Sequence, residues 1–423
     1  MSHECSQSGR EAGHESAYKV RAVSCDHRSD GQVVYRALSM AAAPLDRSWE
    51  RLKRAKVIAV KVNQEWPGPE PPVFEGQRVQ LVSDKVVRAV LRLLRENTAA
   101  RIVCCDASYY VMYSDKRAED TLSIASALED FDVEYVDGNT SRPVTVHIEK
   151  GGRMFDRYVL MRDAVEADAL VSVAKMKNHA FMGITGCLKN LFGLVPGLPQ
   201  GRPRHYYHHI VRMPYVLADI GAIYNPVLNI VDGLVGQAGE EWGEARGRVA
   251  DALVAGDHPV AVDACMTHLM GHDPLSDWPE MPFLVNRNAL RVSAEGGYGS
   301  VSLDEIDFTS EVERQPEGAF FADRRDACET IVRWRATMCE QALYYRDHIR
   351  QFERYAGQYI LLQSREVIWH DSQGVINMSR RKLAGNDRDN ALFFKYVDPD
   401  EGEGERFEVY ERTLHRMKEL GIS

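Results

Sequence analysis

The segment 174–209 reads AKMKNHAFMGITGCLKNLFGLVPGLPQGRPRHYYHH and directly follows the apolar run ALVSV at 169–173. It holds three lysines, four histidines, five glycines and three prolines. Glycine and proline are poor helix formers, yet the segment is too rich in leucine, phenylalanine and valine for a flexible linker. We interpret it as a glycine-rich loop that follows a buried strand and closes on a ligand.

Strand and helix patterns alternate on the N-terminal side of this segment. Apolar alternation and short β-branched runs predict strands over Tyr18–Cys25, Lys56–Val62, Arg101–Cys105 and Val133–Val136, and helices over Asp30–Ala42, Ser83–Glu96 and Thr121–Phe131. Such an order predicts parallel β-α-β units. The expected fold class is therefore α/β, with a mostly parallel sheet and flanking helices.

The C-terminal side continues the pattern and then changes. A hairpin is expected at Thr145–Ile148 and Tyr158–Met161, strands at Ala169–Val173, Val227–Val231 and Leu253–Ala255, helices at Arg162–Glu166, Pro214–Tyr224, Pro259–Leu269 and Asn288–Ala294, and a loop at Gln237–Arg248. We expect two α/β lobes, 18–140 and 141–325, around the Gly/Lys/His-rich cleft. Residues 1–17 contain few apolar side chains and are expected to be disordered.

Residues 326–423 are expected to form a small α+β appendage. The predicted elements are a long helix at Ala327–Tyr355, strands at Tyr359–Leu362, Glu366–His370 and Leu392–Tyr396, and a helix at Phe407–Leu420.

Composition excludes several classes of protein. The net charge of -10 over 423 residues argues against a nucleic-acid or anionic-membrane partner. No apolar run approaches the roughly 18 residues of a membrane helix, and the polar N-terminus does not resemble a signal peptide, so we expect a cytoplasmic protein. The eight cysteines form no CxxC pair, which argues against a disulfide scaffold or an iron–sulfur cluster. GITGCLKN lacks the ending of a phosphate-binding P-loop, and GGYG lacks the context of a dinucleotide fingerprint.

The central segment supplies the expected catalytic residues, His179, Lys189 and His205. Lysines held in a glycine loop can bind anions or act as bases, and histidine transfers protons near neutral pH. Gly183, Gly186 and Gly193 would let the backbone approach the ligand and offer N–H groups to an anion. The alternative is a glycine-rich turn followed by a helix with solvent-facing lysines.

Further candidates for substrate binding come from the same segment and from the ends of strands. They are Lys175, Lys177, Asn63, Asp106, Ser108, Asn190, Asp232 and Asp257. Ligands of α/β sheets bind beyond the carboxyl ends of strands, although such residues can also simply cap turns. Asp263 could contribute to the site or lie on a helix face, and Cys187 lacks an evident basic partner for a nucleophile.

A divalent metal is the one cofactor for which the sequence offers candidate ligands. His205, His208 and His209 are spaced to share a helix face, and His179 could join them. The alternative is a solvated or stacking patch of rings.

The residue blocks resemble a known family. KMKNH at 175–179, GITGCLKNLFGLVPG at 183–197, VLNIVDGLVG at 227–236 and GDHPVAVDACMTHLMGHDP at 256–274 are similar to blocks of the domain-of-unknown-function 362 family. The resemblance covers about residues 18–310. Many relatives carry ferredoxin-like cysteine clusters, a pattern that this chain lacks.

A second, shorter resemblance concerns His179, Lys189 and His205. Their order and spacing resemble the motif of nickel-pincer lactate racemases, in which the lysine tethers the cofactor and the histidines ligate the metal or act as acid and base. The rest of that family's pattern is not evident here.

The leading hypothesis is an enzyme, an isomerase or oxidoreductase, that moves a proton or hydride on a small anionic metabolite in a biosynthetic pathway. One alternative is a metal- or iron–sulfur-associated protein that uses an external redox partner. Another is a non-catalytic binding or assembly protein, for which the appendage would serve as an interaction or homo-oligomerisation module.

Overall fold

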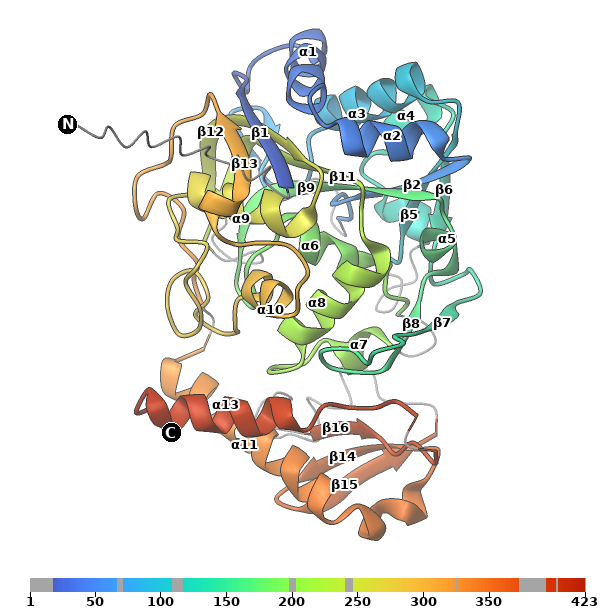
Figure 1. Ribbon diagram of the computed structural model, residues 1–423, viewed down its shortest axis with the longest axis vertical. Coiled ribbons are helices and arrows are strands. Elements are labelled where there is room, and N and C mark those ends of the chain that lie inside the picture. Colours follow the sequence, from blue (N-terminus) through green and yellow to red (C-terminus); the bar gives the residue numbers. More distant parts are fainter. Residues whose placement is uncertain are drawn as a thin grey trace, which may run out of the picture.

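The computed structural model describes residues 18–66, 71–108, 117–197, 203–239, 246–324, 326–372, 393–400 and 402–422. The disorder expected for residues 1–17 lies outside these described residues. The predicted α/β class is confirmed: helices cover both faces of a large, mostly parallel sheet (Figure 1).

The sheet has nine strands in the order β13-β1-β12-β11-β9-β2-β5-β6, with β10 paired to β9. Their bounds are β1 (Tyr18–Ser24), β2 (Val57–Val62), β5 (Arg101–Asp106), β6 (Glu134–Asp137), β9 (Ala169–His179), β10 (Gly183–Ile184), β11 (Leu228–Ala238), β12 (Arg246–Gly256) and β13 (Ile306–Ser310). Strands β11, β9, β2, β5 and β6 are parallel, whereas β12 is antiparallel to both of its neighbours. The carboxyl ends of the five parallel strands therefore share one edge of the sheet.

Strands of the two expected lobes interleave in this sheet. Strand β2 lies between β9 and β5, and β1 lies between β12 and β13. Residues 18–140 and 141–325 are thus joined through one continuous hydrogen-bonded sheet.

Two layers of helices bury the sheet (Figure 1). On one face lie α1 (Gly31–Ala42), α2 (Asp46–Arg54), α3 (Asp84–Asn97) and α4 (Ala125–Asp130); on the other lie α6 (Gly186–Asn190), α8 (Met213–Tyr224), α9 (Pro259–Leu269) and α10 (Ala289–Glu295). Helix α3 follows the predicted spacing, because Val86, Val90 and Leu94 recur on one side and pack with the β2 residues Ile58 and Val60.

Shorter elements connect these layers. They are α5 (Arg162–Val165), α7 (Arg204–Tyr207), the 3₁₀ turns η2 (Ala118–Thr121), η3 (Leu191–Leu194) and η4 (Leu303–Glu305), and two hairpins, β3 (Val73–Phe74) with β4 (Gln77–Arg78) and β7 (Val144–His147) with β8 (Arg157–Leu160). The second hairpin confirms its prediction. Over the described residues, no helix combines the length and apolar character that a bilayer span requires.

Several strands are longer than predicted. Strand β9 continues through Lys175 and Lys177 to His179, so the first part of the expected glycine loop is extended chain. The expected loop at Gln237–Arg248 is wrong at both of its ends, since β11 runs to Ala238 and β12 begins at Arg246. Lysines in β9 and the Gly/Glu-rich sequence between β11 and β12 made these strand ends look like loops; in β9, Lys175 is buried because it pairs with Asp232 of β11.

The C-terminal unit, residues 328–422, is an α+β structure as predicted. It contains α11 (Cys328–Asp347), η5 (Ile349–Tyr355), β14 (Tyr359–Gln363), β15 (Glu366–Asp371), β16 (Phe393–Tyr396) and α13 (Glu408–Glu419). The three strands form an antiparallel sheet in the order β15-β14-β16. The predicted long helix ends at Asp347 and continues as a 3₁₀ turn.

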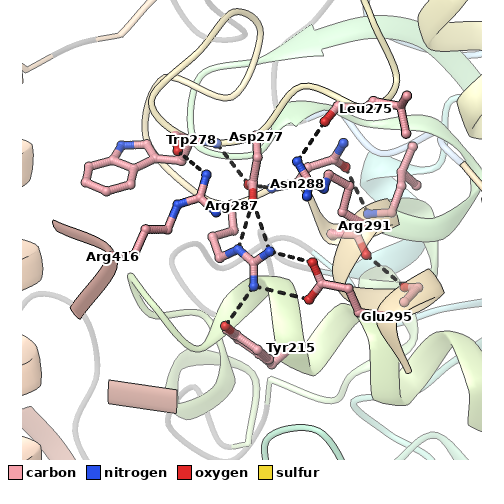
Figure 2. Close-up of polar contacts among 12 residues, drawn as sticks. Tyr215, Leu275, Asp277, Trp278, Arg287, Asn288, Arg291, Glu295 and Arg416 are labelled. Carbon is pink, nitrogen blue, oxygen red and sulfur yellow. Dashed lines mark hydrogen bonds and ion pairs between the residues drawn. The ribbon is translucent and has the colours of Figure 1, made fainter. Parts of the chain in front are cut away.

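Asp277 joins the C-terminal unit to the main body (Figure 2). Its Oδ2 atom lies 2.9 Å from Nη2 of Arg287 and 3.2 Å from Nη1 of Arg416 on α13. Its Oδ1 atom accepts hydrogen bonds from the N–H groups of Trp278 and Asn288, at 2.9 and 2.8 Å. A buried carboxylate with this many charged and neutral donors holds its surroundings in one arrangement.

Candidate functional site

The carboxyl ends of β2, β5 and β9 form the edge at which α/β sheets bind ligands. Lys61 of β2 and Asp106 of β5 form an ion pair here, with 3.1 Å between Nζ and Oδ2. Both side chains are 4% exposed. Lys61 also donates to the carbonyl of Val62 at 2.7 Å, and Gln64 donates to Asp106 at 3.1 Å. Any side chain at Gly193 would collide with this pair.

Lys61 was not among the predicted site residues. The signal available was a lone lysine inside the apolar run VIAVKV, since a charge in a buried strand requires a partner. That partner, Asp106, was among the predicted candidates.

Asn63 and Asn190 bring two amide groups to the same edge. The amide nitrogen of Asn190 donates to the carbonyls of Lys61 and Val173, at 3.1 and 3.2 Å, and to the hydroxyl of Ser172 at 3.1 Å. The Oδ1 atoms of Asn63 and Asn190 are buried and accept no hydrogen bond from the described part of the protein. Buried polar atoms rarely stay unbonded, so two acceptors are suited to a donor from a ligand.

Ser108 belongs to a neighbouring hydrogen-bond network. Its hydroxyl donates to Glu65, its N–H donates to Asp137 at 3.2 Å, and its carbonyl accepts from Asn139 at 2.8 Å. Asn139 in turn accepts from the N–H of Gly197 at 2.7 Å. Ser108 thus lies at the predicted edge, where it ties β5 to the end of the glycine-rich segment.

His208 lies between two aromatic rings. Its ring stacks on Phe181 with 4.9 Å between centroids and a 20° angle, and it lies 5.5 Å from Phe192. Phe181 belongs to the turn that joins β9 to β10. The alternative of a stacking patch, which the sequence left open, therefore describes the His208 ring well.

The charges of four cationic and imidazole side chains act on His208. We define the His208 cluster as His208, Lys189, His179, His205 and Arg204. Desolvation, followed by the charges of these neighbours, holds the pKa of His208 well below its usual value. His208 is therefore neutral at pH 7, with its ring nitrogens able to accept a proton only at a cost.

Lys189 and Arg204 are half-buried, and the three residues predicted to be catalytic all act electrostatically on the His208 ring. Arg204, which was not predicted, donates to the carbonyl of Ala107 at 2.5 Å, and its guanidinium lies 5.7 Å from the centre of the Phe192 ring. The cluster is thereby joined to the end of β5.

The turn after β9 fixes the tautomer of His179. Its Nδ1 atom accepts hydrogen bonds from the N–H groups of Phe181 and Met182, at 3.0 and 3.2 Å. Since an accepting nitrogen carries no hydrogen, the proton of the neutral ring resides on Nε2. His179 is therefore a hydrogen-bond donor through Nε2.

Asp263 on α9 positions the helix that carries Lys189. Its carboxylate accepts from the N–H groups of Cys187 and Leu188, at 2.6 and 2.8 Å, at the start of α6. Burial raises the pKa of Asp263 to about 7. Gly186 has a φ of +59°, and a side chain there would collide with the carboxylate. These helix N–H groups therefore bond Asp263, which corrects the expectation that the glycine turn offers them to an anion.

Lys175 and Asp232 form a wholly buried ion pair. Nζ and Oδ2 are 3.0 Å apart, and both side chains are 0% exposed. Asp232 also accepts from the N–H groups of Ser83 and Leu234, at 2.7 and 3.1 Å. Burial lowers the pKa of Lys175. Lys177, two residues along β9, is buried as well. The structure thus places the two strand lysines inside the protein, on the same side of β9 as each other.

Asp257 lies at the opposite edge of the sheet. It follows the carboxyl end of β12, which pairs with the beginning of β11. Its carboxylate lies 2.7 Å from Arg47 and accepts from the N–H of Lys19 at 2.9 Å. The structure therefore does not bring Asp257 to the His208 cluster.

The remaining metal candidate, His209, is 1% exposed, and its Nδ1 atom lies 3.3 Å from the carbonyl of Ile210. Within the described ranges, the one group of three or more potential metal ligands with closely spaced atoms is Asp26, His27 and Asp251.

The thiol of Cys187 is buried, and burial raises its pKa well above the usual value, which disfavours a nucleophilic thiolate.

Comparison with known proteins places this geometry in a family. The family model "Domain of unknown function (DUF362)" matches residues 58–268, which include β5, β9, α6 and α7 and all but one residue each of β2 and α9. A thylakoid-associated protein of Synechocystis sp. (strain ATCC 27184 / PCC 6803 / Kazusa) is 28% identical over 136 residues, which are 30% of this chain and 41% of that relative. The chain thus matches well under two thirds of the relative's length. Through residues 58–268, the chain belongs to the DUF362 family.

Proposed function

We propose that the His208 cluster binds a small anionic metabolite, a carboxylate or phosphate, and transfers a proton at a neighbouring carbon atom. The observation that carries the proposal is the His208 imidazole, which stacks on Phe181 and is kept neutral by burial and by the charges of Lys189, His179 and Arg204, with Arg204 bonded to the end of β5. Half-buried cations and N–H donors are suited to an anion.

Each side chain has a role in this proposal. Lys189 and Arg204 would hold the anionic group, Lys189 as a compact charge and Arg204 as a planar fork of donors. His179 would donate a hydrogen bond from Nε2 to a substrate oxygen. His208, neutral at pH 7, would accept the proton from carbon once the negative charge of the bound substrate offsets the charges of its neighbours, and would then return it.

The two unbonded amide oxygens narrow the substrate class. Buried Oδ1 atoms at Asn63 and Asn190 require donors, which a purely anionic ligand does not supply. We therefore include in the proposal that the metabolite carries a hydroxyl or an amine as well as its anionic group.

Hydrogen exchange at carbon tests the proposal whatever product the enzyme forms. A panel of small hydroxy and amino acids is incubated with the protein in D₂O, and loss of the signal of the C–H group next to the carboxylate is followed by proton NMR. Removal of that proton by an imidazole and return of a solvent-derived deuteron leave the rest of the molecule unchanged.

The expected result is exchange in at least one compound, reduced by a factor of roughly 10²–10⁴ in His208→Gln. Lys189→Met should also abolish exchange. Lys19→Met is the matched control, since Lys19 is an equally half-buried lysine at the opposite edge. Equal exchange rates in the wild type and in Lys189→Met would overturn the proposal.

A further inference from the structure

Side chains of helix α7 and of the residue that ends it, His208, face two different neighbours. Arg204, His205 and His208 belong to the His208 cluster. Tyr206, in contrast, points to the C-terminal unit, because adjacent helical residues point about 100° apart. Its ring meets Phe394 of β16 edge-on at 5.4 Å and Tyr359 of β14 at 5.7 Å.

Polar contacts fix Tyr206 as well as packing does. Its hydroxyl donates to Glu403 at 2.9 Å and accepts from the N–H of Tyr396 at 3.4 Å. Glu403 lies 2.5 Å from Lys395, a buried lysine that also lies 2.8 Å from Glu405. The contact of α7 is therefore made to a buried network of charges and not to one mobile side chain.

Arg212 closes this network from the main body. Its guanidinium lies 2.7 Å from Glu405, with side chains 0% and 1% exposed, and donates to the carbonyl of Phe394 at 2.7 Å. It also lies 4.8 Å from the centre of the Tyr206 ring. Residues at both ends of segment 206–212 are thus bonded to residues 394–405, and charges that are buried in this way tolerate little displacement.

We infer that the C-terminal unit is a positioning element of the His208 cluster and acts through Tyr206 and Arg212. The expected effect on catalysis rests on the proposed function. The placement of the imidazoles by the C-terminal unit does not depend on it. The imidazoles of His205 and His208 are set in place by contacts that lie on the far side of α7. The candidate site is therefore built from two units, and the appendage takes part in it without touching the substrate.

Tyr206→Phe tests the inference, since it keeps the ring and removes the hydroxyl bonded to Glu403. The readout is the pKa of His208, followed by NMR of the imidazole nitrogens of the folded full-length protein. A contact that only stabilises the fold would leave this pKa unchanged in the folded molecules. We expect the pKa of His208 to rise toward its usual value as the ring moves away from its cationic neighbours.

Tyr298→Phe is the matched control, because it removes a hydroxyl bonded to Asn225 at 3.3 Å in a contact outside the C-terminal unit. It should leave the pKa of His208 as in the wild type. If Tyr206→Phe does not fold, Glu403→Gln replaces it; the amide still accepts from Tyr206, and a smaller shift in the same direction is expected.

The rate of catalysis provides a second, independent test of the inference. The rate of deuterium exchange should fall on the order of ten-fold in Tyr206→Phe, as for other residues that orient a reacting group. If the wild type catalyses no exchange but the pKa of His208 shifts, the proposed function fails and the positioning role stands. An unchanged pKa of His208 in a folded Tyr206→Phe or Glu403→Gln protein overturns the inference.

Discussion

Lys175 and Lys189 lie 14 residues apart in segment 174–209 and have opposite surroundings. Lys175 is inside β9, 0% exposed, with its ammonium 3.0 Å from Asp232. Lys189 lies near the end of α6, half-buried among imidazoles and Arg204. Lys175 is paired with a buried carboxylate of the neighbouring strand, whereas the charge of Lys189 acts on the His208 imidazole. We propose that the second, half-buried environment is the one that takes an external anion.

The first prediction concerns Lys175, the lysine paired with a buried carboxylate. Lys175→Met leaves Asp232 buried without its cation, and we expect a loss of about 3–5 kcal/mol of unfolding free energy. Urea denaturation of the two proteins measures the difference. The double variant Lys175→Met/Asp232→Asn should recover part of the loss, because no unpaired charge stays buried; a further loss in the double variant would argue against a structural ion pair.

The second prediction concerns the support of Lys189. Asp263→Ala leaves the first N–H groups of α6 without their acceptor and should cost about 1–2 kcal/mol, as for other helix caps. Denaturation by urea again gives the value. Asp263→Asn keeps one acceptor oxygen and should lose less, so equal losses in the two variants would mean that the cap contributes little.

The third prediction compares two histidines whose pKa values shift in opposite directions. His27 lies 2.8 Å from Asp251 and 3.0 Å from Glu75. Burial opposes its charge, but hydrogen bonds to Asp251 and Glu75 outweigh burial and raise its pKa above 6.5. The stability that it contributes is therefore fully present below pH 6.5 and is lost as the pH rises through the pKa of the folded protein.

The melting temperature, measured from about pH 5 to about pH 9, should thus fall toward high pH with a component that is missing in His27→Gln. If the melting temperature of His27→Gln depends on pH in the same way as that of the wild type, the contacts of His27 with Asp251 and Glu75 do not stabilise the protein. In His208, whose pKa is lowered, the sign is reversed, and no such loss toward high pH is expected.

The smallest effect on stability is expected for Lys189→Met. Since the side chain of Lys189 is half-buried, unlike that of Lys175, its replacement should change the unfolding free energy by only about 0.5 kcal/mol. Anion binding, measured by calorimetry with oxalate or inorganic phosphate, should be lost in the same protein. A large loss of stability in Lys189→Met with anion binding retained would mean that Lys189 has a structural role and does not bind the anion.

Much of the fold was predictable because the spacing of apolar residues along the chain indicates which side of a helix or strand is buried. The spacing of Val86, Val90 and Leu94 located α3, and the β-branched run at 57–62 located β2. Strand β9 was predicted too short, since Lys175 and Lys177 look solvated until Asp232, far along the chain, is placed beside them. Neither the sequence of β9 nor that of β11 by itself indicates that Lys175 and Asp232 pair across the sheet.

The candidate site was predictable in its residue types and less so in its geometry. His179, Lys189 and His205 all act electrostatically on His208, but Asp257 lies at the opposite edge because β12 reverses direction. Lys61 was missed because a lysine in a strand carries no local signal of its partner. The role of Tyr206 depends on a contact with Glu403, which lies 197 residues further along the chain.

The most direct test of the His208 cluster is an oxalate titration followed by the imidazole ¹⁵N signals of the wild-type protein. We predict saturable shifts for His179, His205 and His208, and none for His258, which lies at the opposite edge beside Asp257. The same titration of Lys189→Met should leave all four signals in place. No saturable shift at His208, or an equal shift at His258, would contradict the binding of an anion at this site.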